Sequence, residues 1–245
     1  MPCGLPRSAL MSCVKASCMK SVVIAILLLV GSLAIAEEAK ISDAAANELL
    51  PTKPEKELTP VQIDAQKLHS GGLKLQEKGD LKKAQASFEK ALVLVPDNIS
   101  VLINLGLLQQ RQKNYVEAER LFKRVLFLQD NNGLAWLLLG IVCYEQNKMD
   151  AAFAHLAQAV LYIPNNAQAR NYLGVVISRR GWYSGAEELL RHAIKLDPKY
   201  AEAHYNLGVL YLERVPPAVE LARRHYEKSV ELGGAPDPDV VKQLE

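Results

Sequence analysis

The 245-residue sequence is short of cysteine and carries almost no net charge. Three of its four cysteines, Cys3, Cys13 and Cys18, precede residue 37, so the rest of the chain holds Cys143 alone. A lone cysteine excludes an intramolecular disulfide framework and a cysteine-rich zinc site. Residues 1–36 also hold three of the 29 basic residues and none of the 27 acidic ones, which leaves the remainder with a formal charge of −1. Such a chain lacks the basic face that binds nucleic-acid phosphates.

The sequence also lacks the common motifs of catalysis and metal binding. No glycine-rich phosphate loop, HExxH helix, GxSxG elbow or EF-hand loop is present, and the five histidines are scattered rather than paired at ligand spacing. Ser87 and Lys90 satisfy an SxxK string, but their helical context favours an exposed serine and a solvated lysine. Cys143 occupies a mid-helix apolar position and is interpreted as a small core residue. We therefore predict no enzyme activity, no cofactor and no metal.

The first 36 residues have the order of a secretory signal. Basic residues up to Lys20 precede an apolar run over residues 21–33, and residues 34–36 (Ala-Ile-Ala) then offer a small-residue cleavage site. We predict cleavage after Ala36 and export to the periplasm or the extracellular space. The alternative is an uncleaved inner-membrane anchor over residues 21–36, although a bilayer span needs about 20 apolar residues and this run has about 16. The true start is Met1, Met11 or Met19.

A charged segment separates this signal from the first strong helix start. Residues 37–58 contain Pro51 and Pro54, and we interpret them as a mobile tether. Thr59 then has the features of an N-cap, with a proline at the first helical position and Gln62 able to reach back to the cap. Ordered structure is expected to begin at this point.

From Ala65 onward the chain matches itself at a period of 34 residues. The five units span residues 65–98, 99–132, 133–166, 167–200 and 201–234. Counted from the start of each unit, position 8 is always glycine, and position 20 is alanine in the first four units. Apolar residues recur at helical spacing on either side of a polar break, which predicts a helix, a turn and a second helix in each unit. One such pair cannot bury its apolar face alone, whereas stacked neighbours can.

This pattern resembles the tetratricopeptide repeat over residues 59–234. The resemblance implies an all-α fold, a right-handed superhelical solenoid of five helix-turn-helix repeats. Small residues at positions 8 and 20, such as Gly106 and Ala118, are expected to mark the close crossing of the two helices in each unit.

The fifth unit departs from the pattern. Its turn is longer and contains Pro216-Pro217, so that Ala222, Tyr226 and Ser229 are expected to take over the second helix. Residues 235–245 remain as a short C-terminal cap, with a helix of two turns at most. Because solenoid ends normally need a full polar-backed cap, this end is predicted to be loosely covered or to associate with itself.

In tetratricopeptide proteins the first helices line the concave face and supply most ligand contacts, so the resemblance implies a binding groove there. Its residues, carried over by position, are Asn104, Leu107, Arg111, Leu134, Leu137, Leu138, Ile141, Tyr144, Asn171, Tyr172, Val175, Arg179, Tyr205 and Asn206. The apolar and aromatic centre suits an extended apolar segment or an amphipathic helix, and the asparagine amides suit a peptide backbone. Leu134 and Leu138 stand where the family's carboxylate clamp needs basic residues, so that clamp is not expected. Alternatively, part of this stripe is buried between neighbouring units.

These features favour an exported, non-enzymatic scaffold or adaptor that binds a protein or peptide, in envelope assembly or trafficking. No nucleic-acid partner is expected, and a membrane is expected only if the signal segment is uncleaved. The alternative is a structural subunit that self-associates through its C-terminal end as a homo-oligomer. An enzyme ranks third, because five repeats and a tether account for nearly every residue after the signal.

Overall fold

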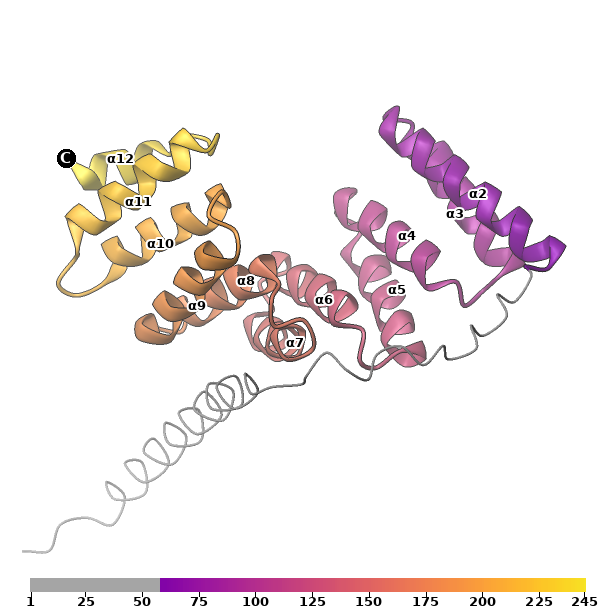
Figure 1. Cartoon of the computed structure of the whole chain (residues 1–245), viewed down its shortest axis with the longest axis horizontal. Helices are drawn as coiled ribbons and strands as arrows, with labels where there is room; N and C mark the ends of the chain where they lie inside the picture. Colours follow the sequence, from indigo (N-terminus) through magenta and orange to yellow (C-terminus); the bar gives the residue numbers. More distant parts are fainter. Residues whose placement is uncertain (1–57) are drawn as a thin grey trace, which may run out of the picture. The chain divides into compact units, whose positions relative to one another are not determined.

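A computed structural model describes residues 58–245, which form eleven α-helices and no strand (Figure 1). The helices are α2 (Pro60–Glu77), α3 (Leu81–Leu94), α4 (Ile99–Arg111), α5 (Tyr115–Leu128), α6 (Gly133–Glu145), α7 (Met149–Tyr162), α8 (Ala167–Ser178), α9 (Tyr183–Leu196), α10 (Ala201–Glu213), α11 (Val219–Glu231) and α12 (Pro238–Leu244). They form one compact unit with hydrophobic clusters of its own. The predictions for residues 1–57, the signal segment and nearly all of the tether, lie outside the described residues.

The helices pair as the 34-residue period predicts. Within each repeat the first helix packs against the second, and each repeat packs on the next in chain order, from α2 in indigo to α12 in yellow (Figure 1). The first helices α4, α6, α8 and α10 also contact one another along the array. Repeating elements approach most closely on the inside of a curved stack, so these helices form the inner, concave row of the all-α solenoid.

The beginning of the helical array has the predicted capping box. α2 begins at Pro60, and the Thr59 side chain accepts a hydrogen bond from the backbone N–H of Gln62 at 3.3 Å. In return, the Thr59 backbone N–H donates to Gln62 Oε1 at 2.9 Å. Two backbone donors that the helix itself cannot satisfy are thereby paired.

In the first four repeats the glycine at position 8 makes room for the large residue at position 24. A Cβ atom added to Gly106 would lie 2.5 Å from Cε1 of Phe122, and one added to Gly140 would lie 2.6 Å from Cγ of Leu156. Ala118, at position 20, is fully buried beside them. The predicted close crossing is confirmed, and its tightest contact is between glycine and a bulky side chain.

Short local signals set both kinds of turn. Within the first four repeats the turn residue at position 15 has a positive φ, at Gly79, Lys113, Asn147 and Gly181. Between repeats, the side chains of Asn98, Asn132 and Asn166 cap α4, α6 and α8 by accepting a backbone N–H bond three residues on. Glycine and asparagine tolerate the left-handed φ found at Gly79, Asn147 and Gly181. Asparagine is also a preferred N-cap residue, as at the turns between repeats.

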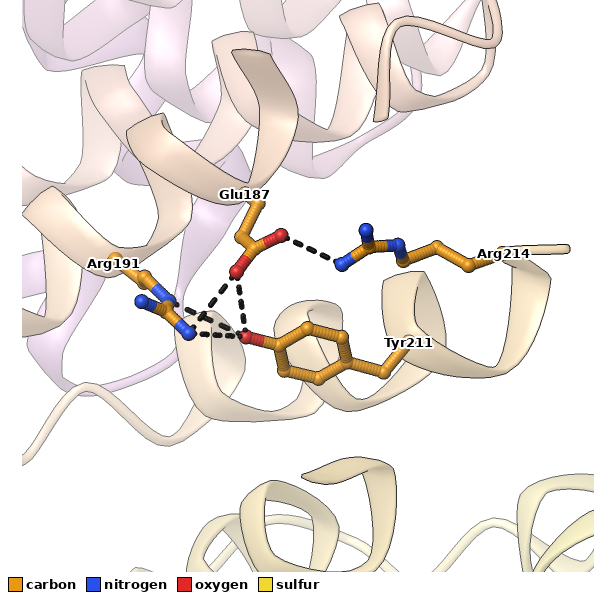
Figure 2. Close-up of polar contacts among 4 residues, drawn as sticks. All are labelled: Glu187, Arg191, Tyr211 and Arg214. Carbon is orange, nitrogen blue, oxygen red and sulfur yellow. Dashed lines mark hydrogen bonds and ion pairs between the residues drawn. The ribbon is translucent and has the colours of Figure 1, made fainter. Parts of the chain in front are cut away.

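The fifth repeat shifts as the sequence predicts, and a polar network secures its longer turn. Figure 2 shows the hydroxyl of the fully buried Tyr211, which donates to Glu187 Oε1 at 3.0 Å and accepts from Arg191 Nη2 at 2.9 Å. The other oxygen of Glu187 pairs with Arg214, at the start of that turn, at 2.9 Å. The buried residues of α11 are Ala222, Tyr226 and Ser229.

The C-terminal helix covers α11 with two side chains. α12 has seven residues, within the predicted two turns, and buries Val240 and Leu244. The turn before it is fixed to the fifth repeat, because Tyr205 donates to Asp237 Oδ2 at 2.5 Å and the Asp237 N–H donates to the Tyr226 hydroxyl at 2.8 Å. The last repeat therefore has a short but well-bonded cap.

Candidate protein-binding face

Thirteen of the fourteen predicted groove residues lie on the first helices α4, α6, α8 and α10, Arg179 is the C-cap residue of α8, and the structure divides the fourteen by exposure. Partly or fully exposed are Asn104, Leu107, Arg111, Leu134, Tyr144, Tyr172, Val175, Arg179, Tyr205 and Asn206; buried are Leu137, Leu138, Ile141 and Asn171. The tetratricopeptide pattern placed the helices correctly, but side-chain access differs from residue to residue.

Three apolar residues of α6 are corrected from groove to core. Leu137, Leu138 and Ile141 are 0%, 6% and 4% exposed. α6 contacts α5 and α7 and also the first helices α4 and α8 on either side, so its sides are covered as well as its back. These three side chains therefore stabilise the repeat stack and offer almost no surface to a ligand.

The three asparagines form hydrogen bonds within the array, and Asn171 is corrected from groove to core, whereas Asn104 and Asn206 stay partly exposed. Asn206 Nδ2 donates to Asn171 Oδ1 at 2.9 Å, and Asn171 Nδ2 donates to the Tyr200 hydroxyl at 3.3 Å. Asn104 Nδ2 donates to His69 Nε2 at 2.8 Å. These side chains join successive first helices, and Asn171 is fully buried.

The residues that stay accessible meet in an aromatic and basic cluster at the third and fourth repeats. The rings of Tyr144 and Tyr172 lie edge to face with centroids 5.9 Å apart, and the guanidinium of Arg179 lies 6.0 Å from the Tyr144 ring centroid. Burial, together with nearby Glu202 and Glu145, raises the pKa of Tyr172 to about 12. The phenol, like that of an ordinary tyrosine, is protonated at neutral pH and can donate a hydrogen bond. Rigid aromatic rings beside an arginine are typical of binding hot spots.

A row of alternating charge borders this cluster. Position 13 of the five repeats carries Glu77, Arg111, Glu145, Arg179 and Glu213, all exposed. Two acids are held in place by the preceding repeat, since Gln110 Nε2 donates to Glu145 at 3.1 Å and Ser178 Oγ donates to Glu213 at 3.2 Å. These five position-13 residues, which we name the inner rim, therefore present charges of alternating sign, one per repeat.

A cavity of about 320 Å³ opens where the second and third repeats meet at this rim. Its lining residues are Leu107, Gln110, Arg111, Lys113, Tyr115 and Glu145. Leu107 and Arg111 were among the predicted groove residues, whereas Gln110, Lys113 and Tyr115 were missed because they lie at the end of α4, in the turn and at the start of α5. Comparing position 13 across the five repeats would have shown the alternation of charge from the sequence alone.

The other chemical candidates have structural roles. Ser87 Oγ donates to the Leu68 carbonyl at 2.8 Å, and Cys143 is buried, which raises the pKa of its thiol. Contrary to the sequence analysis, two histidines are paired, because the packing of α10 on α11 brings His204 Nδ1 within 3.1 Å of His225 Nδ1. Across residues 58–245, no group of three or more His, Cys, Asp or Glu side chains is placed to hold a metal ion.

None of the helices in the described part of the chain is long and apolar enough to cross a membrane.

Comparison with known families identifies the repeat. A family model described as "Tetratricopeptide repeat" matches residues 75–141 and 111–176, and one described as "TPR repeat" matches residues 179–214. Together these matches cover more than half of the chain, and they agree with the period, the helix pairs and the inner row described above. The chain is a tetratricopeptide-repeat protein. A search of curated proteins found no match.

Solved structures share the solenoid. The fold of pilF of Pseudomonas aeruginosa is similar, with a TM-score of 0.66 and 18% identity, over 76% of this chain and 83% of that one. MamA of Desulfovibrio magneticus RS-1 is also similar, with a TM-score of 0.61 and 21% identity, over 69% of this chain and 95% of that one. A third is YrrB, described as a TPR protein with an unusual peptide-binding site, with a TM-score of 0.56 and 25% identity, over 73% of this chain and 90% of that one. At these identities the likeness supports the fold.

Proposed function

We propose that this chain is a non-enzymatic scaffold that binds a protein or peptide segment through its inner face. The observation that carries the proposal is the accessible cluster of Tyr144, Tyr172 and Arg179 beside the cavity at the second and third repeats. Aromatic rings bury apolar side chains at low entropic cost, and arginine supplies a directional charge-assisted bond. The tetratricopeptide fold is typically an interaction scaffold, and the description of YrrB as a peptide binder agrees with this use.

The same geometry narrows the kind of segment expected. Leu107 and Leu134 offer apolar surface, whereas Arg111 and Arg179 alternate with Glu145 along the rim. An extended or helical segment with an apolar or aromatic anchor and acidic residues near it would satisfy both features. Because Leu137, Leu138 and Asn171 are buried, recognition is expected to depend chiefly on side chains of the segment.

Selection from a display library of random dodecamer peptides tests this proposal on a chain of residues 37–245. We expect enrichment of peptides that pair an aromatic or large apolar residue with an acid. Arg179→Ala should weaken a selected peptide about tenfold, or about 1.4 kcal/mol. Arg124→Ala is the matched control, because Arg124 also lies over an aromatic ring, at 5.3 Å from the Phe127 centroid, but on a second helix. No enrichment, or equal loss in both variants, would overturn the proposal.

We also propose that residues 1–36 direct export, so that the scaffold works outside the cytoplasm in envelope assembly or trafficking. The support is the basic, apolar and small-residue order of the sequence. Fusion of a periplasm-dependent reporter enzyme, with and without these residues, tests export. The mass of the exported chain then separates cleavage after Ala36 from a retained inner-membrane anchor.

A further inference from the structure

The cavity at the junction of the second and third repeats gathers two cations. Arg111, the last residue of α4, and Lys113, in the turn that follows, both line this cavity of about 320 Å³, and both are exposed. None of the ion pairs within residues 58–245 includes either side chain. Leu107 and Tyr115 add apolar surface and a phenol to the same lining. The cavity therefore holds positive charge that the described fold does not use.

The acid that lines the cavity does not neutralise these cations. Both carboxylate oxygens of Glu145 accept from Gln110 Nε2, at 3.2 Å and 3.1 Å. Glu145 is thus held by an uncharged partner instead of by Arg111. With two cations and one acid, the lining has a formal charge of +1. This charge is complementary to a single carboxylate.

Lys113 is also unusual in its backbone conformation. Its φ is 60°, in the left-handed region, whereas the equivalent turn residues of the first, third and fourth repeats are Gly79, Asn147 and Gly181. Glycine and asparagine tolerate this conformation, but for a lysine it costs free energy. Because the same turn forms with glycine or asparagine in three other repeats, the fold does not require a lysine here. Backbone strain that folding does not require is typical of functional sites.

We propose that this cavity binds one side-chain carboxylate, from an aspartate or glutamate of the segment that lies on the inner face. The inference rests on the proposed function and adds the place where the acid is bound. Lys113 supplies a positive charge, and Arg111 can donate two parallel hydrogen bonds to the two carboxylate oxygens. The Tyr115 hydroxyl can donate a further bond, and Leu107 offers apolar surface to the methylene groups next to the carboxylate.

The cavity and the aromatic cluster are adjacent, because Glu145 of the cavity directly follows Tyr144 of the cluster in α6. A segment anchored on Tyr144 and Tyr172 therefore places its acid within a few residues of the aromatic or apolar anchor. Glu145 disfavours a second acid in the cavity, since like charges repel each other. One acid at a fixed spacing from the anchor is the expected pattern.

Parallel selections from the random dodecamer library, on residues 37–245 and on their Lys113→Asn variant, test this pattern. Peptides fused through their C-terminus to the display protein have no free C-terminal carboxylate, so an enriched acid is a side chain. We expect the wild-type chain to enrich an acid at a fixed spacing from the anchor, and Lys113→Asn to enrich the anchor without the acid. Asparagine is the residue that the third repeat has at this position, so the variant should unfold at no lower urea concentration than wild type.

Lys78→Asn is the matched control for this selection. Lys78 is exposed in the corresponding turn of the first repeat and is not among the residues that line the cavity. The substitution removes the same charge from the protein, so it tests whether total charge alone draws acidic peptides. We expect Lys78→Asn to select the same acidic pattern as wild type.

A selected peptide then measures the contact directly, by fluorescence anisotropy. Replacing its acid with the corresponding amide should weaken binding to wild type about tenfold. The same replacement should change binding to Lys113→Asn and to Arg111→Gln much less, because the partner of the acid is already removed or weakened.

Two different results separate this inference from the proposed function. Selected peptides that need no acid, or an acid whose replacement weakens wild type and Lys113→Asn equally, would overturn the carboxylate site while the inner face still binds peptides. If no peptide is enriched at all, the proposed function fails and the carboxylate site fails with it.

Discussion

Replacing Gly106 by alanine puts a methyl group where the ring of Phe122 already lies. The added Cβ would be 2.5, 2.9 and 3.0 Å from Cε1, Cζ and Cδ1 of that ring. Phe122 is fully buried and packs with Ala118, Leu138 and Leu139, so its ring has no free space into which it can retreat. Overpacking of this kind costs about 1–3 kcal/mol. A contact as short as 2.5 Å belongs to the upper part of that range, about 2–3 kcal/mol. Because alanine in place of helical glycine returns about 1 kcal/mol, we expect a net destabilisation of about 1–2 kcal/mol.

Gly71 is the matched control for this substitution. It lies in α2, one residue before the equivalent glycine of the first repeat, and a Cβ there would meet only Ser87 Oγ at 3.9 Å. Gly71→Ala should therefore stabilise the protein by about 0.5–1 kcal/mol through helix propensity. Gly174→Ala belongs between the two, since its Cβ would lie 3.0 Å from Leu190 Cγ.

Urea unfolding of residues 37–245, followed by circular dichroism at 222 nm, measures the three variants against wild type. The expected order of midpoints is Gly71→Ala above wild type, Gly174→Ala near it, and Gly106→Ala clearly below. If Gly106→Ala unfolds at or above the wild-type midpoint with an unchanged slope, close helix crossing is not the reason for glycine at position 8.

Three further outcomes follow from the geometry. Burial and the neighbouring His204 lower the pKa of His225 to about 4, so the folded state favours the neutral ring, and stability falls as the pH drops from about 6.5 toward 4. After allowance for the partial exposure of His225, we expect the free energy of unfolding to be about 1 kcal/mol lower at pH 5 than at pH 6.5. Urea titrations at these two pH values measure the difference, which should be smaller in His225→Gln. Lys113 has a φ of 60°, so Lys113→Gly should raise the free energy of unfolding in a urea titration by about 1 kcal/mol, whereas Gln112→Gly beside it should lower that free energy. Tyr211→Phe removes the buried hydroxyl of the network in Figure 2 and should cost about 1–2 kcal/mol, and an unchanged thermal midpoint would count against that network as a brace.

The repeat architecture was predictable because its determinants are local or periodic. The Thr59 capping box depends on residues three apart, and the helix pairs depend on glycine, alanine and apolar spacing that recurs every 34 residues. Even the irregular fifth repeat was read correctly, since Ala222, Tyr226 and Ser229 restore the helical period after the longer turn.

Access to the inner face was harder to predict, because it depends on what the neighbouring repeats do. Leu137 and Tyr172 both occupy inner-row helices, yet one is fully buried and the other half-buried. Asn171 and Asn206 stand 35 residues apart, and only stacking reveals that each supplies the other's hydrogen-bond partner. The pairing of His204 with His225 was not predicted either, because it depends on how α10 packs on α11.

The sequence by itself therefore determined that this protein is a tetratricopeptide solenoid, because helix capping depends on residues a few positions apart and periodic burial depends on a pattern that recurs every 34 residues. Tertiary structure decided which side chains remain free to bind. A residue's exposure is set by the packing of adjacent repeats, and that packing buries Leu137 and Leu138 of α6 and leaves Tyr144 and Arg179 accessible.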